Sequence, residues 1–199
     1  TARVGMNALE KRSVVALASV YAMRMLGLFM VMPVFVLLGT DLQGATPALL
    51  GLAIGAYGLS QALLQIPFGL LSDRVGRKKM IYLGLILFAS GSLLAASTDS
   101  IYVVIAGRIL QGAGAIASVL MALLSDLTRE EERTKAMATV GISIGLSFSV
   151  SLVLGPLLGA AWGLSGIFYV TAVMALLALV VVARVVPTPH THKVSADTH

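Results

Sequence analysis

The sequence has 199 residues, of which 58% are hydrophobic and only 12% are charged, with a formal net charge of +5. Ordinary soluble domains carry about 25% charged residues, so this composition excludes a soluble globular domain and favours an integral membrane protein. The sequence has no cysteine, which excludes disulfides and cysteine metal sites. The positive charge does not indicate a nucleic-acid partner, because the bases are placed as membrane topology requires.

Six apolar segments follow one another along the chain, each of about the length that a membrane helix needs. They cover residues 13–38, 48–71, 80–97, 101–124, 137–160 and 166–186. Backbone polar groups in lipid must be paired within their own segment, so all six spans should be helical. The predicted fold class is an all-α membrane protein, a six-transmembrane-helix bundle over 13–187. A cytoplasmic segment at 1–12 should precede it, and a flexible cytoplasmic tail at 188–199 should follow it.

The basic residues lie on one side of this arrangement. Twelve of the fourteen Lys and Arg residues lie before the first span, after the second or fourth span, or at the end of the sixth span and beyond it. The other three loops carry none. Because cytoplasmic loops hold the excess of Lys and Arg, both termini are expected in the cytoplasm. The uneven distribution of Lys and Arg between the two sets of loops also supports an even number of spans.

Two arginines remain inside the membrane. Arg24 lies about 15 Å into the first span, at 1.5 Å per residue, and Arg108 lies in the fourth span. A buried arginine is costly unless it is paired or hydrated, so each is a candidate for substrate binding, coupling or conformational change. The alternative is a structural arginine bonded to backbone carbonyls or Gln side chains.

Further polar side chains occur at helical spacing on the same spans. Tyr57, Gln61 and Gln65 share one face of the second span, and Gln111 follows Arg108 on the fourth. Polar stripes in a membrane should face protein or water. The first, second, fourth and fifth spans are therefore expected to line a cavity, with the third and sixth outside. The alternative is that the polar side chains only bridge packed helices.

No Asp or Glu lies in the middle of any span. Proton-coupled transport usually needs a titratable group in the pathway. Either Asp41, Asp99 or Asp126, each near the end of a span, takes the proton, or the coupling acid belongs to a chain segment outside this sequence.

The loop between the second and third spans is short and highly charged. Residues 69–79 read Gly-Leu-Leu-Ser-Asp-Arg-Val-Gly-Arg-Lys-Lys, with one acid, four bases and two glycines. The charges must stay at the membrane surface, and the glycines allow a tight turn between two helices.

This loop resembles the signature between helices 2 and 3 of the major facilitator superfamily, its motif A. The motif positions are filled by Gly69, Asp73, Arg74, Gly76, Arg77 and Lys78. The stretch with Arg108, Gln111 and Gly112 resembles the fourth-helix motif, which is associated with proton coupling. Gly155, Pro156 and Gly159 match part of the fifth-helix antiporter motif. Within the family, the chain looks most like YajR-type drug/proton antiporters of bacterial inner membranes.

The resemblance implies a specific architecture. The family has twelve helices in two six-helix halves, each a 3+3 inverted repeat, that rock around a central site. The chain then corresponds to the N-terminal half, and its tail to the start of the linker between the halves. The implied partners are the lipid bilayer, a small-molecule substrate and a missing C-terminal half or a second copy of the chain. No cofactor is implied, because the proton gradient supplies the energy.

The resemblance also implies a role for the charged loop. In the family, the motif A aspartate is associated with a helix end in the other half, where a helix N-terminus favours a carboxylate. Asp73 occupies that position, and Arg77 is spaced to hold it. Our hypothesis is a cytoplasmic latch of Asp73, Arg77, Asp126 and Arg133. The alternative, which we favour for Arg74 and Lys78, is that the loop only enforces topology and a tight turn.

The leading interpretation is half of a secondary active transporter for proton-coupled efflux of drugs or other amphipathic molecules by alternating access. Phe29 and Met30 could supply an adaptable apolar wall, although both are also ordinary core residues. One alternative is a symporter or facilitator for a polar or anionic nutrient, with Arg24 and Arg108 binding negative charge. Another is a non-transporting membrane module that needs a partner half. An enzyme is not expected, because the spans hold no His, Cys or paired carboxylate.

Overall fold

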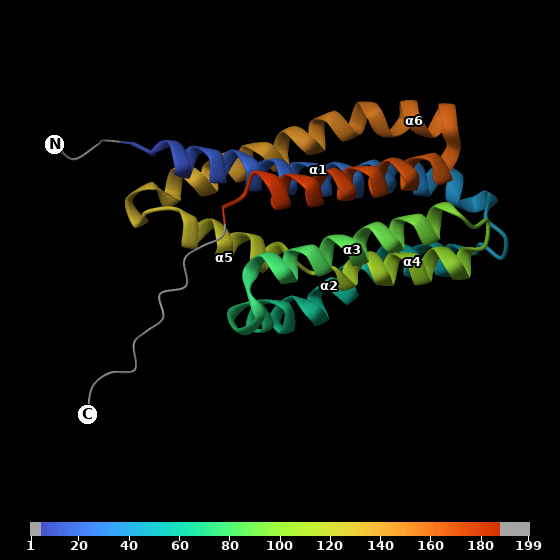
Figure 1. The fold of residues 1–199 in the computed structure, drawn as a ribbon. Helices are drawn as coiled ribbons and strands as arrows, with labels where there is room; N and C mark the ends of the chain where they lie inside the picture. The colour runs from blue at the N-terminus through green and yellow to red at the C-terminus, as the bar shows by residue number, and fades with distance from the viewer. Residues whose placement is uncertain (1–4, 188–199) are drawn as a thin grey trace.

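The computed structural model describes residues 5–187. The described chain forms the helices α1 (Ala8–Leu38), α2 (Pro47–Val75), α3 (Arg77–Ala96), α4 (Ile101–Ala113), α5 (Ala117–Leu127) and α6 (Arg133–Arg184) (Figure 1). Two short 3-10 helices, η1 (Gly39–Asp41) and η2 (Glu130–Glu132), lie in the connections. Arg3, Lys193 and the predicted tail at 188–199 lie outside the described residues.

The helix α6 consists of two arms that run in opposite directions. Its backbone leaves helical geometry at Gly163, where φ is 71° and ψ is −171°, a conformation that a residue without a side chain adopts readily. The ribbon reverses at this point (Figure 1). We call residues 133–162 arm 1 and residues 164–184 arm 2. They contain most of the two predicted spans 137–160 and 166–186.

The fourth predicted span differs from the expectation of one helix over 101–124. Instead, α4 ends at Ala113 and α5 begins at Ala117. Within the break, the Ile116 N–H donates to the Gly114 carbonyl at 2.9 Å, so the regular helical ladder is interrupted. Hydropathy could not reveal this break, because the three residues between the helices are small or apolar.

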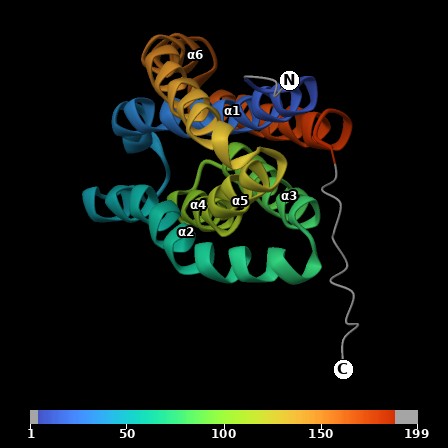
Figure 2. The same cartoon turned by 90° about the vertical axis from the view of Figure 1, so that its left-hand side faces the viewer.

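The helices pack in two layers. The first layer holds α1 and both arms of α6, and the second holds α2, α3, α4 and α5 (Figures 1 and 2). Buried apolar side chains fill the space between the layers, among them Leu17, Ile81, Leu120, Leu123 and Ala178. Because lipid tails are as apolar as these side chains, it is close packing that holds such helices together in a membrane.

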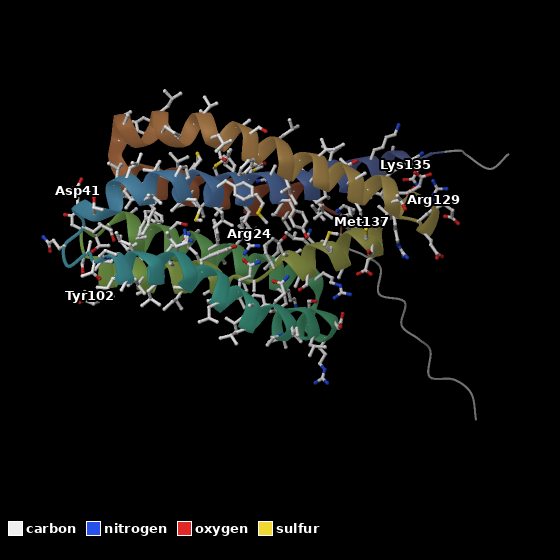
Figure 3. The ribbon with its side chains drawn as sticks, turned by 180° about the vertical axis from the view of Figure 1, so that it is seen from behind. Arg24, Asp41, Tyr102, Arg129, Lys135 and Met137 are labelled. Carbon is white, nitrogen blue, oxygen red and sulfur yellow. The ribbon has the colours of Figure 1, made fainter. Side chains whose placement is uncertain are left out.

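The two ends of the bundle differ in charge. The start of α1, the end of α6 and the α2–α3 turn lie at one end (Figure 1). Arg129 and Lys135 lie at that end too, whereas Asp41 and Tyr102 lie at the other (Figure 3). We call the first end the basic end, because it carries the loop arginines and lysines of the described chain. At the opposite end, the Ile101 N–H donates to the Gln43 carbonyl at 3.1 Å and joins two loops.

Candidate functional site

Arg24 lies in the middle of the bundle, between the two layers (Figure 3). It is 1% exposed. Its Nη2 donates to the Gly114 carbonyl oxygen at 2.9 Å and to the Tyr57 hydroxyl oxygen at 3.2 Å. Its Cζ lies 5.5 Å from the centre of the Phe88 ring. In the described part of the chain, its Nε and Nη1 have no hydrogen-bond partner, so this buried cation is only partly compensated.

Arg108 is also buried, and it makes contacts on several sides. Its Nε donates to the Ala53 carbonyl at 3.1 Å, and its Nη1 donates to Gln111 Oε1 at 3.2 Å. Its Cζ lies 5.0 Å from the centre of the Tyr57 ring. Gln111 in turn donates from Nε2 to Ser92 Oγ at 2.8 Å. These are the backbone carbonyl and Gln partners that the structural alternative predicts.

Tyr57 joins the two arginines, because its hydroxyl meets Arg24 and its ring meets Arg108. Close packing of α2 on α4 brings this about. A Cβ atom on Gly112 would lie 2.3 Å from the Tyr57 carbonyl oxygen, so only glycine fits there. The structure therefore brings together Arg24, Tyr57, Arg108, Gln111 and Gly112, which the sequence predicts as pathway residues. We call the four side chains of this group the polar cluster.

Three members of the surroundings were missed by sequence reasoning. Tyr21 lies one helical turn before Arg24 on α1, and its hydroxyl donates to the Ala117 carbonyl at 2.5 Å. Ser92 and Phe88 come from α3, so the third helix also contributes side chains to the surroundings of the polar cluster. The spacing of Tyr21 and Arg24, three residues apart, was the available signal, since such residues share a helix face.

Gln61 and Gln65 lie outside the polar cluster. The side chain of Gln61 makes no hydrogen bond to any described residue. The backbone carbonyl of Gln65 accepts from Ser118 Oγ at 3.2 Å, while its buried Oε1 has no partner within residues 5–187. These two side chains therefore continue the polar face of α2 without a hydrogen bond to either buried arginine.

Phe29 and Met30 pack against arm 1. The Phe29 ring meets the Phe148 ring edge to face, with the ring centres 5.3 Å apart. A Cβ on Gly155 would lie 3.1 Å from the Met30 carbonyl oxygen, and one on Gly159 would lie 2.9 Å from a Val34 methyl group. The glycines of the fifth-helix motif thus allow close packing of arm 1 on α1. Pro156, between them, is exposed.

A groove with a volume of about 250 Å³ lies between α1 and the arms of α6. Its lining includes Ala22, Met23, Ser143 and Ser147, but no member of the polar cluster. Ser147 Oγ donates to the Ala22 carbonyl at 3.1 Å. This serine therefore bridges packed helices, as the alternative reading of the polar stripes predicts.

A charge network lies at the basic end. Arg77 Nη1 contacts Asp73 Oδ1 at 2.5 Å and Ser72 Oγ at 2.7 Å, and its Nε contacts Asp126 Oδ2 at 3.1 Å. Arg77 therefore ties the α2–α3 turn to the end of α5. The side chains of Asp73 and Asp126 are 56% and 41% exposed, so both remain accessible to a partner.

The other predicted latch residues have separate roles. Arg133 Nη2 donates to the Ser125 carbonyl at 3.2 Å, next to Asp126, and forms no ion pair within the described residues. Gly76 has a φ of 122°, which suits glycine at the turn. A Cβ on Gly69 would lie 3.3 Å from Ser118 Oγ, so Gly69 lets α2 approach α5. Arg74 is exposed, and Lys78 donates to the Val186 carbonyl at 2.8 Å.

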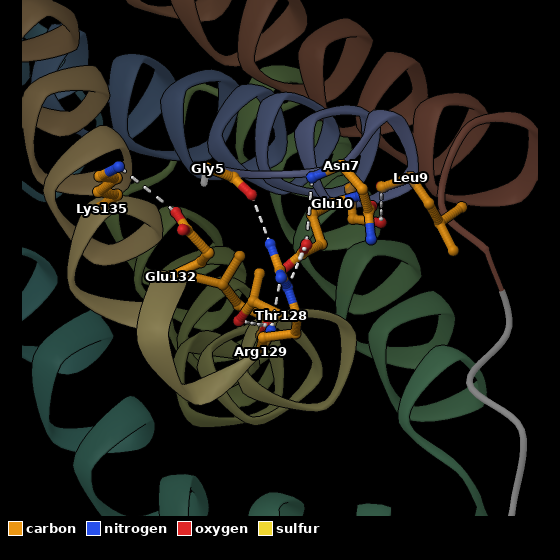
Figure 4. Close-up of polar contacts among 10 residues, drawn as sticks. Gly5, Asn7, Leu9, Glu10, Thr128, Arg129, Glu132 and Lys135 are labelled. Atoms are coloured by element: carbon orange, nitrogen blue, oxygen red, sulfur yellow. Dashed lines mark hydrogen bonds and ion pairs between the residues drawn. The ribbon is translucent and has the colours of Figure 1, made fainter. Parts of the chain in front are cut away.

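A second ion pair, missed in the sequence, joins α1 to the α5–η2 connection (Figure 4). The side chain of Glu10 is 4% exposed, and its Oε1 lies 2.9 Å from Arg129 Nε. Its Oε2 accepts from the Arg129 backbone N–H at 2.9 Å. Asn7 and Glu10 also form a reciprocal capping box at the start of α1. The Asn-x-x-Glu spacing was a usable signal, since it is a helix N-terminus signature.

Comparisons with known proteins agree with this arrangement. The model of the family described as Major Facilitator Superfamily matches residues 17–198. The chain is 52% identical to the inner membrane transport protein YajR of Escherichia coli (strain K12), over 94% of this chain and 41% of that protein. It is 35% identical to multidrug resistance protein 2 of Bacillus subtilis (strain 168), over 75% of this chain and 37% of that protein.

A solved structure shows the same fold. The crystal structure of the human organic anion transporter MFSD10 matches with a TM-score of 0.76 and 21% identity, over 92% of this chain and 49% of that one. The chain thus spans about half the length, or less, of each of these proteins.

Proposed function

The chain belongs to the major facilitator superfamily, and we propose that it forms the N-terminal six-helix half of a transporter that works by alternating access. The observation that carries the proposal is the charge network at the basic end. Arg77 ties the α2–α3 turn to α5 while Asp73 stays 56% exposed. An accessible carboxylate at a helix end can bind the positive N-terminal end of a helix in a second half.

The proposed orientation places the basic end, and both ends of the six-helix unit, in the cytoplasm. The positive-inside rule supports this, because the loops at the opposite end carry no Lys or Arg. The name of the YajR relative supports a bacterial inner membrane. The partners are then the bilayer, the substrate and a second six-helix half.

The proposed activity is proton-coupled export of drugs or other amphipathic molecules. The name of the Bacillus subtilis relative supports the substrate class. The polar cluster supports coupling, because two buried arginines near the middle of the bundle make its packing sensitive to any charge that enters. The proton carrier is proposed to be Asp126 or an acid of the second half, since no Asp or Glu lies in the middle of a span.

The test is transport by proteoliposomes that contain this half together with a second six-helix half. With a pH gradient imposed, we expect a cationic amphipathic dye to move against its own gradient and to stop when a protonophore is added. Dye movement that ignores the pH gradient would contradict proton coupling. Absence of dye movement in both conditions would contradict drug export.

An anionic substrate is the second candidate, and the Nε and Nη1 atoms of Arg24 favour it, because they have no partner among the described residues. Uptake of a labelled carboxylate in the same vesicles, with no dye export, would support this candidate. The third candidate is a non-transporting module that needs a partner half, and vesicles that contain only the 199-residue chain test it. We expect them to show no flux of either probe.

A further inference from the structure

Two basic side chains hold the end of α6. Arg12 donates from Nε to the Val185 carbonyl at 2.9 Å and from Nη2 to the Arg184 carbonyl at 3.1 Å. Lys78 donates from Nζ to the Val186 carbonyl at 2.8 Å. Three successive carbonyls therefore receive cationic donors from α1 and α3. We call Arg12, Lys78 and these carbonyls the α6-end clamp.

Helix physics explains why this end attracts two cations. The last carbonyls of a helix have no N–H partner within it, and together they carry a partial negative charge. The Val185 N–H still donates to the Val181 carbonyl at 2.9 Å, so α6 remains regular up to the clamp. Val186 is buried in the same apolar cluster as Val182 and Met80. Charge and packing thus hold residues 184–186 in place, and we call these residues the exit of α6.

The clamp residues lie close in sequence to Arg77 and Glu10, which form ion pairs at the basic end. Lys78 follows Arg77 directly at the start of α3, and Arg77 contacts Asp73 and Asp126. Arg12 lies two residues after Glu10 in the first turns of α1. Because helical backbones are stiff over one turn, a displacement of the α3 start must move the Arg77 and the Lys78 contacts together.

We propose that Lys78 and Arg12 are positioning residues that couple the α2–α3 turn to the exit of α6. They set the direction in which the chain leaves this six-helix unit. When the Asp73–Arg77 contact rearranges, Lys78 passes the change to the carbonyl of Val186. The consequence for transport rests on the proposed function, in which the chain beyond α6 leads to a second half. The coupling within the unit does not depend on it.

The test is hydrogen exchange of the 199-residue chain in lipid nanodiscs. We expect Lys78→Gln to speed amide exchange at residues 183–186 roughly tenfold, because a charge-assisted hydrogen bond is lost. The matched control is Lys79→Gln, which removes the same charge from an exposed side chain that has no hydrogen bond within the described residues. Lys78→Arg should restore slow exchange, because Arg also donates to carbonyls.

The coupling has its own readout in the same experiment. Lys78→Gln should also speed exchange in the turn at residues 73–77, and Arg12→Gln should do so more than Lys11→Gln. A capping role alone would loosen residues 183–186 and leave the turn unchanged, which would overturn the coupling. Equal effects of Lys78→Gln and Lys79→Gln at residues 183–186 would overturn the clamp itself.

Transport is measured separately, so that the two proposals can fail independently. The chain has no cysteine, so single reporter cysteines at either end of the two-half transporter can report which side is open. We expect Lys78→Gln, but not Lys79→Gln, to change their labelling rates several-fold. Exchange results as expected with no flux in the unmodified transporter would overturn the proposed function and leave the coupling standing.

Discussion

The guanidinium of Arg24 donates to the carbonyl oxygen of Gly114 at 2.9 Å and so joins the middle of α1 to the end of α4. This cation lies where a helix C-terminus presents partial negative charge. The break that follows fits against α3, since a Cβ on Gly84 would lie 2.0 Å from a methyl carbon of Ile116. A membrane helix that is interrupted beside a buried charge is a common place for substrate or ion binding in transporters.

Tyr21→Phe tests the hydrogen bond that Tyr21 makes with the first residue of α5, just after this break. The Tyr21 hydroxyl donates to the Ala117 carbonyl at 2.5 Å, and Phe keeps the ring while it removes the donor. We expect the variant to lose about 0.5–1.5 kcal/mol of unfolding free energy, measured by denaturant titration of the chain in detergent. The control is Tyr102→Phe on an exposed ring at the far end, which should leave stability unchanged. Equal stability of both variants would show that the Tyr21 hydrogen bond does not stabilise the fold.

Gly112→Ala tests the close contact between α2 and α4. The added Cβ would meet the Tyr57 carbonyl at 2.3 Å, so the two helices must separate. We expect the unfolding free energy to fall by about 1–3 kcal/mol, the usual cost of overpacking, in the same denaturant titration. Tyr57 should then move away from Arg24 and Arg108.

Gly141→Ala is the matched control for this substitution. Nothing lies within 4 Å of a Cβ at Gly141 on arm 1, and Ala favours a helix over Gly by about 1 kcal/mol. The control should therefore be neutral or slightly stabilising. If Gly112→Ala is as stable as Gly141→Ala, α2 and α4 are not in close contact at Gly112.

Much of the polar cluster follows from sequence pattern. Arg24 and Arg108 are the bases that lie away from the ends of the spans, and Tyr57 and Gln111 lie on polar faces of neighbouring helices. An apolar surrounding leaves such groups few partners besides one another, so their contact was predictable. The charge pattern likewise placed Arg77 near Asp73 and Asp126, which the structure shows in contact.

The break between α4 and α5 could not be predicted in the same way. Gly114, Ala115 and Ile116 suit a continuous apolar span, and the Gly114 carbonyl in the break accepts from Arg24, which is 90 residues away in sequence. Lys78 presents the same difficulty. Its position in a charged loop indicates a surface cation, but its partner Val186 is 108 residues away. Only tertiary packing selects these two carbonyls as acceptors.

Glu10→Gln tests the ion pair that joins α1 to the α5–η2 connection. The Glu10 carboxylate accepts from the Arg129 backbone at 2.9 Å and side chain at 2.9 Å. An amide would turn one acceptor into a donor facing an N–H group. We expect a loss of about 1–3 kcal/mol in unfolding free energy, measured by denaturant titration of the chain in detergent.

Glu131→Gln serves as the control for this pair. It removes the same charge from an exposed side chain in η2. We expect a change below about 0.5 kcal/mol, as for most surface substitutions. If Glu10→Gln is as mild as Glu131→Gln, the start of α1 is not anchored through Arg129.

Asp73→Asn separates a role in stability from a role in conformational change. The Asp73 side chain is 56% exposed and pairs with Arg77, so its loss should cost the chain alone less than about 1 kcal/mol. In the two-half transporter, the same change removes the charge that is proposed to bind a helix end of the second half. We therefore expect the inward-open population, measured with reporter cysteines, to rise several-fold and export to fall.

Asp99→Asn is the matched control for this last substitution. Asp99 is exposed at the opposite end, and its side chain makes no hydrogen bond within residues 5–187. It should leave the inward-open population unchanged. If Asp73→Asn gives the same inward-open population as Asp99→Asn, the exposed carboxylate is not a latch. Arg77 would then only tie the α2–α3 turn to Asp126. In that case, Asp126→Asn should lower the unfolding free energy more than Asp73→Asn does.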